Sequence, residues 1–349
     1  MSYTILPGIE RLLIEAVNRN ASDIHLQPGE PPALRVDGVI ERTERDPLSA
    51  DEISEIAAAA VGEQELVRIG REVGEVHRAL NLSEEFSGRV AVARSGGDYT
   101  ISIRLLPRSI PSLESIQFPQ SMLDAARSPH GLVIISGPTG SGKSTAAFSV
   151  LEHINAHSPS HICTVEDPIQ YRLSAKKALV QQREVGSDVP DTVAGIQASL
   201  RQDPDVIFIG ELKSVEELEA SIAAAELGHL FIIVLHASTP EDALQRLMDI
   251  FPEEVRDVSR KALARVLRGV SAQVLLPAKD KPGRTVAYGV LIPDDEMRAA
   301  IVEGRDVLAR RNPLPEGCRT LDQDIERLAN EGKVSEEVAE RYRGRDSSF

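Results

Sequence analysis

The chain has 349 residues and a formal net charge of −15 at pH 7, and this length predicts two domains, each large enough to bury a core. Hydrophobic residues make up 42% and charged residues 27%, which excludes wholesale disorder. Aromatic residues are only 3%, so a surface that stacks bases or sugars on several rings is not expected. Because Asp and Glu number 54 against 39 Lys and Arg, we expect no nucleic acid partner.

The cysteines and the apolar runs indicate a cytoplasmic protein with no direct membrane insertion. Cys163 and Cys318 are too few for a disulfide framework or a four-thiolate zinc site, which fits a reducing compartment. The start, MSYTILPGIERLLIEAVNR, lacks a basic segment followed by a long apolar one. The apolar run from Leu230 to Leu235 is far shorter than a bilayer span.

The first 107 residues predict a small α+β domain with an antiparallel sheet. Apolar residues at helical spacing predict helices at 8–19, 50–61 and 64–73. Short strands are expected in DIHLQP and ALRVDGVIE, and residues 88–107 alternate around a Gly96-Gly97 turn as a hairpin does. Three prolines in PRSIPSLESIQFP then indicate a linker, which we place at 108–120.

The second domain, at 121–349, alternates compact apolar strands with amphipathic helices. This order predicts an α/β fold with a parallel sheet covered on both faces. The expected strands are GLVIISG, HICTVED, DVIFIGE and HLFIIVLHA. Beyond them we expect helices at 241–251 and 253–272, a hairpin from QVLLPA and RTVAYGVLI, and polar helices to the end.

A phosphate-binding loop is the strongest motif of the chain. The segment GPTGSGKST matches G-x-x-x-x-G-K-[ST] and lies between an apolar strand and a helix, as the motif requires. Its glycines let backbone N–H groups turn toward phosphate oxygens. Lys143 supplies a cation to the β- and γ-phosphates, and the Ser144 hydroxyl can hold Mg²⁺. The expected nucleotide-binding residues are Gly137, Pro138, Thr139, Gly140, Ser141, Gly142, Lys143, Ser144 and Thr145.

Carboxylates that could act on the γ-phosphate follow two of the strands. HICTVED ends in Glu166 and Asp167, and DVIFIGE ends in Glu211. Strands of a parallel sheet present their carboxyl ends at one edge, so these acids are expected beside the loop, where they can order a water or bind Mg²⁺. Sequence position alone does not divide these roles between Glu166 and Glu211.

Two histidines bracket the strand HLFIIVLH and are expected to differ in function. At ~3.3 Å per residue they lie roughly 23 Å apart, so they cannot both touch one γ-phosphate. His236 is at the phosphate edge and is the expected phosphate sensor. His229 follows Gly228, and we expect it to be structural or a subunit contact.

Two arginines on facing strands of the predicted hairpin are candidates for contact with the phosphates. Phosphoryl transfer commonly uses an arginine supplied from another domain or subunit. Arg89 and Arg104 lie shortly before the linker, where this is feasible. The alternative is that both are solvated strand residues.

With these motifs the chain resembles the type II/IV secretion ATPase superfamily (GspE/PilT-like), and within it the PilT-like retraction ATPases of type IV pili. The resemblance extends over nearly the whole chain. The similar segments, in family order, are ASDIHLQPGEPPALRVDG, GPTGSGKST (Walker A), TVEDPIQY (Asp box), LRQDPDVIFIGE (Walker B) and AAELGHLFIIVLHA (His box).

The resemblance implies a hexameric ring of subunits, each with a PAS-like N-terminal domain and a RecA-like domain that binds ATP. Arg89 and Arg104 would then reach toward the phosphates, Glu166 would activate the attacking water, and Glu211 would serve Mg²⁺. Hydrolysis would exert force on the inner-membrane platform protein of a pilus or secretion machine, with the ring at the cytoplasmic face of that membrane.

Some segments depart from the family pattern. Leu212-Lys213-Ser214 follows Glu211 where the family usually has Met-Arg-Asp, Leu227 replaces a frequent Thr, and EMRAAIVEGR only loosely resembles the segment associated with retraction. Alternatives are therefore a pilus-extension or secretion ATPase, and a nucleotide-binding assembly subunit with negligible turnover. A DNA-driven motor is disfavoured by the charge.

Overall fold

The computed structural model describes most of the chain and divides it into two compact units. The described residues are 4, 6–19, 21–36, 38–71, 74–82, 86–107, 109–280, 283–306 and 314–343. The units are Met1–Ser109 with Gln170–Arg172, and Ile110–Ile169 with Leu173–Phe349. The first boundary between them therefore falls inside the segment predicted as the linker.

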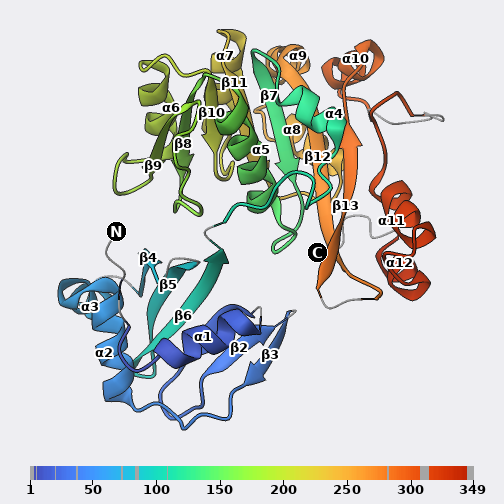
Figure 1. Cartoon of the computed structure of the whole chain (residues 1–349). Coiled ribbons are helices and arrows are strands. Elements are labelled where there is room, and N and C mark those ends of the chain that lie inside the picture. Colours follow the sequence, from blue (N-terminus) through green and yellow to red (C-terminus); the bar gives the residue numbers. More distant parts are fainter. Residues whose placement is uncertain are drawn as a thin grey trace. The chain divides into compact units, whose positions relative to one another are not determined.

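The first unit is an α+β domain built on an antiparallel sheet of order β3-β2-β1-β6-β5-β4 (Figure 1). Its helices are α1 (Glu10–Asn18), α2 (Ala50–Val61) and α3 (Glu63–Arg71). Its strands are β1 (Ala21–Leu26), β2 (Ala33–Val36), β3 (Val39–Arg42), β4 (Glu75–Asn81), β5 (Phe86–Ser95) and β6 (Asp98–Pro107). Among the described elements of this unit, strand β4 alone was not predicted from the sequence pattern.

Alternation along β5 and β6 decides which face of this sheet is covered. Val90 and Ile103 are fully buried and belong to a core cluster that includes Ile53 of α2. Helix α2 starts at a capping box in which Ser49 and Glu52 satisfy each other's backbone N–H groups. The neighbours Arg89 and Arg104 point to the opposite face, because successive strand residues alternate.

The second unit has a mixed sheet of order β13-β12-β7-β11-β10-β8-β9, in which every pair except β12 with β13 is parallel. Its strands are β7 (Gly131–Ser136), β8 (His161–Glu166), β9 (Leu179–Glu184), β10 (Val206–Ile209), β11 (Leu230–Leu235), β12 (Leu267–Pro277) and β13 (Arg284–Leu291). Its helices are α4 (Gln120–Ala125), α5 (Lys143–His157), α6 (Thr192–Leu200), α7 (Val215–Glu226), α8 (Pro240–Asp249), α9 (Arg256–Val266), α10 (Asp295–Glu303), α11 (Leu321–Asn330) and α12 (Glu336–Tyr342). The α/β class with a parallel sheet is confirmed.

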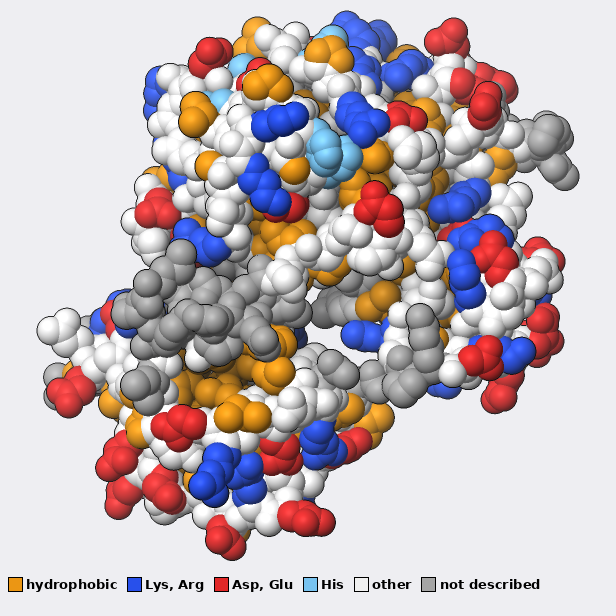
Figure 2. All heavy atoms as spheres, in the orientation of Figure 1, with side chains coloured by type: hydrophobic (Ala, Val, Ile, Leu, Met, Phe, Trp, Pro, Cys, Tyr) orange, Lys and Arg blue, Asp and Glu red, His pale blue; other side chains and the backbone are white. Residues whose placement is uncertain are grey.

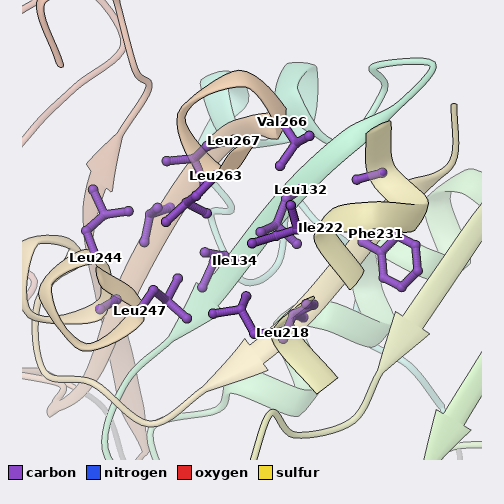
Figure 3. Close-up of a cluster of buried hydrophobic side chains, with 14 of the residues drawn as sticks. Leu132, Ile134, Leu218, Ile222, Phe231, Leu244, Leu247, Leu263, Val266 and Leu267 are labelled. Carbon is purple, nitrogen blue, oxygen red and sulfur yellow. The ribbon is translucent and has the colours of Figure 1, made fainter. Parts of the chain in front are cut away.

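The larger core of the second unit lies between the sheet and the helices α7, α8 and α9. Figure 3 shows Leu132 and Ile134 of β7 surrounded by Leu218, Ile222 and other apolar side chains of these helices. The opposite face of the sheet packs on α5, where Phe148 meets Phe208 edge-to-face with ring centroids 5.3 Å apart. Helices therefore cover both faces, and the strands β7, β10 and β11 are buried along their whole length.

One predicted helix is wrong in its extent. The helix expected over 253–272 ends at Val266, and β12 starts at Leu267 and runs parallel to β7. A side chain at Gly269 would come within 2.9 Å of the Met122 sulfur, so the backbone of β12 passes close to α4 there. The polar strand β9 was also missed, because its sequence LVQQRE lacks an apolar pattern.

The surface carries both signs of charge. On the face shown in Figure 2, acidic and basic side chains are both spread over the two units. Within the described part of the chain, no helix combines the length and apolar character needed to cross a membrane.

Replacing Phe231 by Ala is expected to lower the free energy of unfolding of the second unit by about 3–5 kcal/mol. Phe231 is fully buried on the central strand β11, so truncation leaves a cavity (Figure 3). Denaturant titration followed by circular dichroism measures this. The control is Val258→Ala on α9, where the side chain is 70% exposed and the change should stay within about 0.5 kcal/mol. Equal midpoints for the two variants would contradict the assigned core.

Candidate active site

The phosphate-binding loop connects β7 to α5, as the motif predicted. Gly142 is the N-cap of α5 and has a φ of +88°, in the left-handed region that favours glycine. Helix α5 then begins at Lys143, and Ser144 is half-buried in its first turn. The first backbone N–H groups of the helix have no hydrogen-bond partner within it. They lie near the end of β7 and can donate hydrogen bonds to an anion there.

Lys143 is a buried cation that contacts the loop itself. Its side chain donates from Nζ to the carbonyl oxygen of Pro138 at 2.8 Å, and the residue is only 7% exposed. Burial lowers the pKa of Lys143 to about 8, and the negative charge of Glu211 opposes this shift. At neutral pH the group is therefore still mainly charged.

His236 links Lys143 to Glu211. Its Nδ1 lies 3.4 Å from Lys143 Nζ, and its Nε2 lies 3.1 Å from Glu211 Oε1. Burial, with a contribution from the Lys143 charge, lowers the pKa of His236. The neutral ring with its proton on Nε2 satisfies both contacts, since Nε2–H can donate to Glu211 and Nδ1 can accept from Lys143. The structure thus brings these three predicted site residues together at the carboxyl ends of β10 and β11.

Glu166 ends β8 beside Gly210. Its side chain is buried, and its Oε1 accepts hydrogen bonds from Thr164 Oγ1 at 2.7 Å and from Gln182 Nε2 at 3.1 Å. A Cβ added to Gly210 would lie 3.4 Å from Glu166 Cα, so Glu166 lies beside the glycine that precedes Glu211. Glu166 is the last residue of β8 and Glu211 follows the neighbouring strand β10, and their environments differ in burial and in partners.

Lys213, one of the residues that depart from the family pattern, forms an ion pair with Asp167 of the Asp box. Its Nζ lies 2.9 Å from Asp167 Oδ2, and this hydrogen bond raises the pKa of Lys213. The pair joins the segment after β10 to the segment after β8. Both side chains are about half exposed, so the pair is expected to contribute little to stability.

A pocket of about 570 Å³ opens next to the loop within the second unit. It is lined by Gly142 and Thr145 from the loop and α5, and by Tyr288 of β13. Lys279, Arg284 and Lys333 add positive charge, and Asp280 and Glu331 add negative charge. The pocket therefore adjoins the predicted phosphate site and offers both polar and apolar walls.

Arg89 and Arg104 lie in the first unit, opposite each other on β5 and β6. Arg104 Nε donates to Asp23 Oδ1 at 2.9 Å, and Asp23 is the direct partner of Arg104 across β1 and β6. The side chain of Arg104 is 55% exposed, so its remaining donors are accessible. Arg104 is thus held on one side rather than simply solvated. That either arginine reaches a phosphate stays a prediction.

The other end of β11 is arranged differently. His229 Nδ1 lies 2.7 Å from the carbonyl oxygen of Pro204, within the same unit. Asp205 accepts the backbone N–H of His161 at 2.7 Å, and Asp203 has a φ of +54° in a turn. His229 and Asp205 thus each make a hydrogen bond within the second unit, and whether His229 is structural or a subunit contact stays a prediction.

Gln273 of β12 is a site residue that sequence analysis missed. Its Nε2 donates to the carbonyl oxygen of Ser141 at 2.8 Å, and its side chain is almost fully buried. Gly137, the first residue of the loop, has no room for a side chain, because a Cβ would lie 2.5 Å from the Gln273 carbonyl oxygen. A Gln directly before the apolar run Val274-Leu275-Leu276 is the signal that could have identified it.

The oxygen ligands available at this edge of the sheet suit Mg²⁺. Magnesium prefers oxygen ligands, and the Ser144 hydroxyl and the Glu211 carboxylate provide a neutral and an anionic one. The Glu211 side chain is 41% exposed, which leaves room for the waters that Mg²⁺ usually retains.

The chain is similar to known proteins over most of its length. Residues 2–282 match the family model of the type II/IV secretion system proteins. The Escherichia coli K12 protein YggR is 33% identical, with 94% of this chain and all of that protein covered. The Pseudomonas aeruginosa type IV pilus retraction ATPase PilT is 31% identical, with 95% and 96% covered. A crystal structure of the pilus retraction motor PilT with bound ADP has a TM-score of 0.84 at 34% identity, with 95% and 96% covered.

Glu211→Gln is expected to lower the pKa values of both His236 and Lys143, because a nearby negative charge favours the protonated form of each. The His236 ring can be titrated by NMR, with His236→Ala to assign its signal. Glu253→Gln, which removes an exposed carboxylate between α8 and α9, is the control and should leave the titration unchanged. An unchanged or raised His236 pKa in the Glu211 variant would contradict the contact.

Proposed function

Because the chain belongs to the type II/IV secretion system protein family, we propose that it is an ATP hydrolase that powers type IV pilus retraction or a related secretion machine. The observation that carries this proposal is the chain of contacts from Lys143 through His236 to Glu211 beside the phosphate-binding loop. These residues come from three strand ends and surround one place where a triphosphate can bind. The similarity to retraction ATPases over nearly the full length of both chains supports it.

The proposed chemistry divides into binding and hydrolysis. The loop N–H groups and Lys143 bind the phosphates, and Lys143 exchanges its contact with Pro138 for a phosphate oxygen. Ser144 and Glu211 would hold Mg²⁺, which would neutralise negative charge on the phosphates. His236 contacts both Lys143 and Glu211 and is placed to sense the γ-phosphate.

Glu166 is the proposed base that orients and activates the attacking water. Its position at the end of β8, next to Glu211, places a second carboxylate at the same edge. The hydrogen bonds from Thr164 and Gln182 hold one oxygen in place, which fixes the orientation of the carboxylate. Glu211 is more exposed than Glu166 and contacts His236, so it is the better candidate for the Mg²⁺ ligand.

The pocket beside the loop is proposed to take the nucleoside part of ATP. Its volume of about 570 Å³ lies within the usual range for ligand sites. Gly142 and Thr145 belong both to its wall and to the loop with its first helical turn, so a ligand can bridge the two regions.

We propose further that the chain works as a hexamer at the cytoplasmic face of the inner membrane, on a platform protein. Transition-state charge in phosphoryl transfer commonly needs an arginine from another domain or subunit. Arg89 and Arg104 of the first unit are the candidates, and Asp23 already fixes one edge of Arg104.

Lys143→Ala is expected to abolish phosphate release, and Glu166→Gln is expected to keep ADP binding while lowering the hydrolysis rate at least tenfold, since general-base catalysis typically contributes about 10²–10⁴-fold. Steady-state phosphate release with Mg²⁺ and ADP titration measure the two effects. Glu219→Gln on α7, an exposed acid, is the control. Unchanged release in both site variants would refute the assignment. ADP binding by the native chain without phosphate release would favour the assembly-subunit alternative.

The ring is tested by light scattering of the full chain with Mg²⁺ and a non-hydrolysable ATP analogue. The expected mass is that of the proposed hexamer, six times the mass of one chain. Subunits are expected to assemble because neighbouring subunits complete the positive charge around the phosphates. A monomer at micromolar concentration in the presence of the analogue would contradict the hexamer.

A further inference from the structure

Gln273 is a buried polar residue that packing does not explain. Its side chain is 2% exposed and lies on β12, whose neighbouring residues Val274, Leu275 and Leu276 are apolar. Its Oε1 is buried and has no hydrogen-bond partner among the described residues. A half-satisfied buried amide is less favourable than an apolar side chain of similar size. A role in the adjoining site is the alternative explanation.

The hydrogen bond from Gln273 fixes one peptide unit of the phosphate-binding loop. Its Nε2 donates to the Ser141 carbonyl oxygen at 2.8 Å. A trans peptide is planar, so this carbonyl and the N–H of Gly142 point in opposite directions. The Gly142 N–H therefore points away from the Gln273 amide. Because Gly142 is the N-cap of α5, this N–H has no partner inside the helix and is available to an anion.

Gln273 also restricts both ends of the loop sterically. A Cβ added to Gly137 would lie 2.5 Å from the Gln273 carbonyl oxygen, and one added to Gly142 would lie 3.1 Å from Gln273 Nε2. The main chain of Gln273 thus supports the start of the loop, and its side chain supports the end. The loop therefore lies against Gln273 of β12 at Gly137 and at Gly142.

We propose that Gln273 is a positioning residue for the phosphate-binding loop: its amide holds the Ser141–Gly142 peptide in the orientation that binds the phosphate groups of the nucleotide. This inference rests on the proposed nucleotide-binding function. It concerns the phosphates alone, so it predicts equal effects on ligands that share phosphates and differ in the nucleoside.

The test is Gln273→Met, which conserves length and approximate volume and removes the hydrogen bond. Displacement of a fluorescent ADP analogue by ADP and by inorganic pyrophosphate gives both affinities. Each Kd is expected to rise roughly five- to tenfold, the effect of losing one net hydrogen bond. Gln273→Asn keeps the amide but is one methylene shorter, so the same weakening is expected, and it replaces the Met variant should that one fail to fold.

The matched control is Ser271→Ala, two residues earlier on the same face of β12, which should bind both ligands like the native chain. Native ADP affinity in the Gln273 variants would overturn the inference. Weaker ADP binding with unchanged pyrophosphate binding would also overturn it, because that result indicates a changed nucleoside pocket. Failure of the native chain to bind ADP would instead overturn the proposed function.

Discussion

Parallel pairing of β8, β10, β11 and β7 delivers four strand ends to one edge of the sheet, and each functional group of the site follows one of these ends. The strands are buried on both faces, so their registers are set by packing along their whole length. The loop after β7, Glu166 at the end of β8, Glu211 after β10 and His236 after β11 therefore have fixed relative positions without being close in sequence.

This arrangement confines a cation, an imidazole and acids within a small, partly buried region. Lys143 loses hydration there and its pKa falls to about 8, while Glu211 limits that fall. The neutral His236 lies between them and can donate to one and accept from the other. A bound triphosphate supplies the anionic charge that favours protonated Lys143.

Much of this site could be predicted from sequence because its groups lie in short local motifs. The loop, the two acids and His236 each follow an apolar strand directly, so a parallel sheet implies that they converge. Gln273 could not be found in this way. Its role depends on β12 lying beside β7, and helical spacing up to residue 272 suggested a helix where the chain had already become a strand at Leu267. The ion pair of Arg104 with Asp23 likewise depends on the pairing of β1 with β6, which local patterns do not specify.

A crystal structure of the full chain with Mg²⁺ and a non-hydrolysable ATP analogue tests the convergence of these groups directly. The phosphates are expected to lie along residues 137–145, with Lys143 Nζ on a β- or γ-phosphate oxygen and with Glu211 and His236 on the same side. Phosphates bound away from this loop, or Lys143 still paired with Pro138 while the analogue is bound, would contradict it.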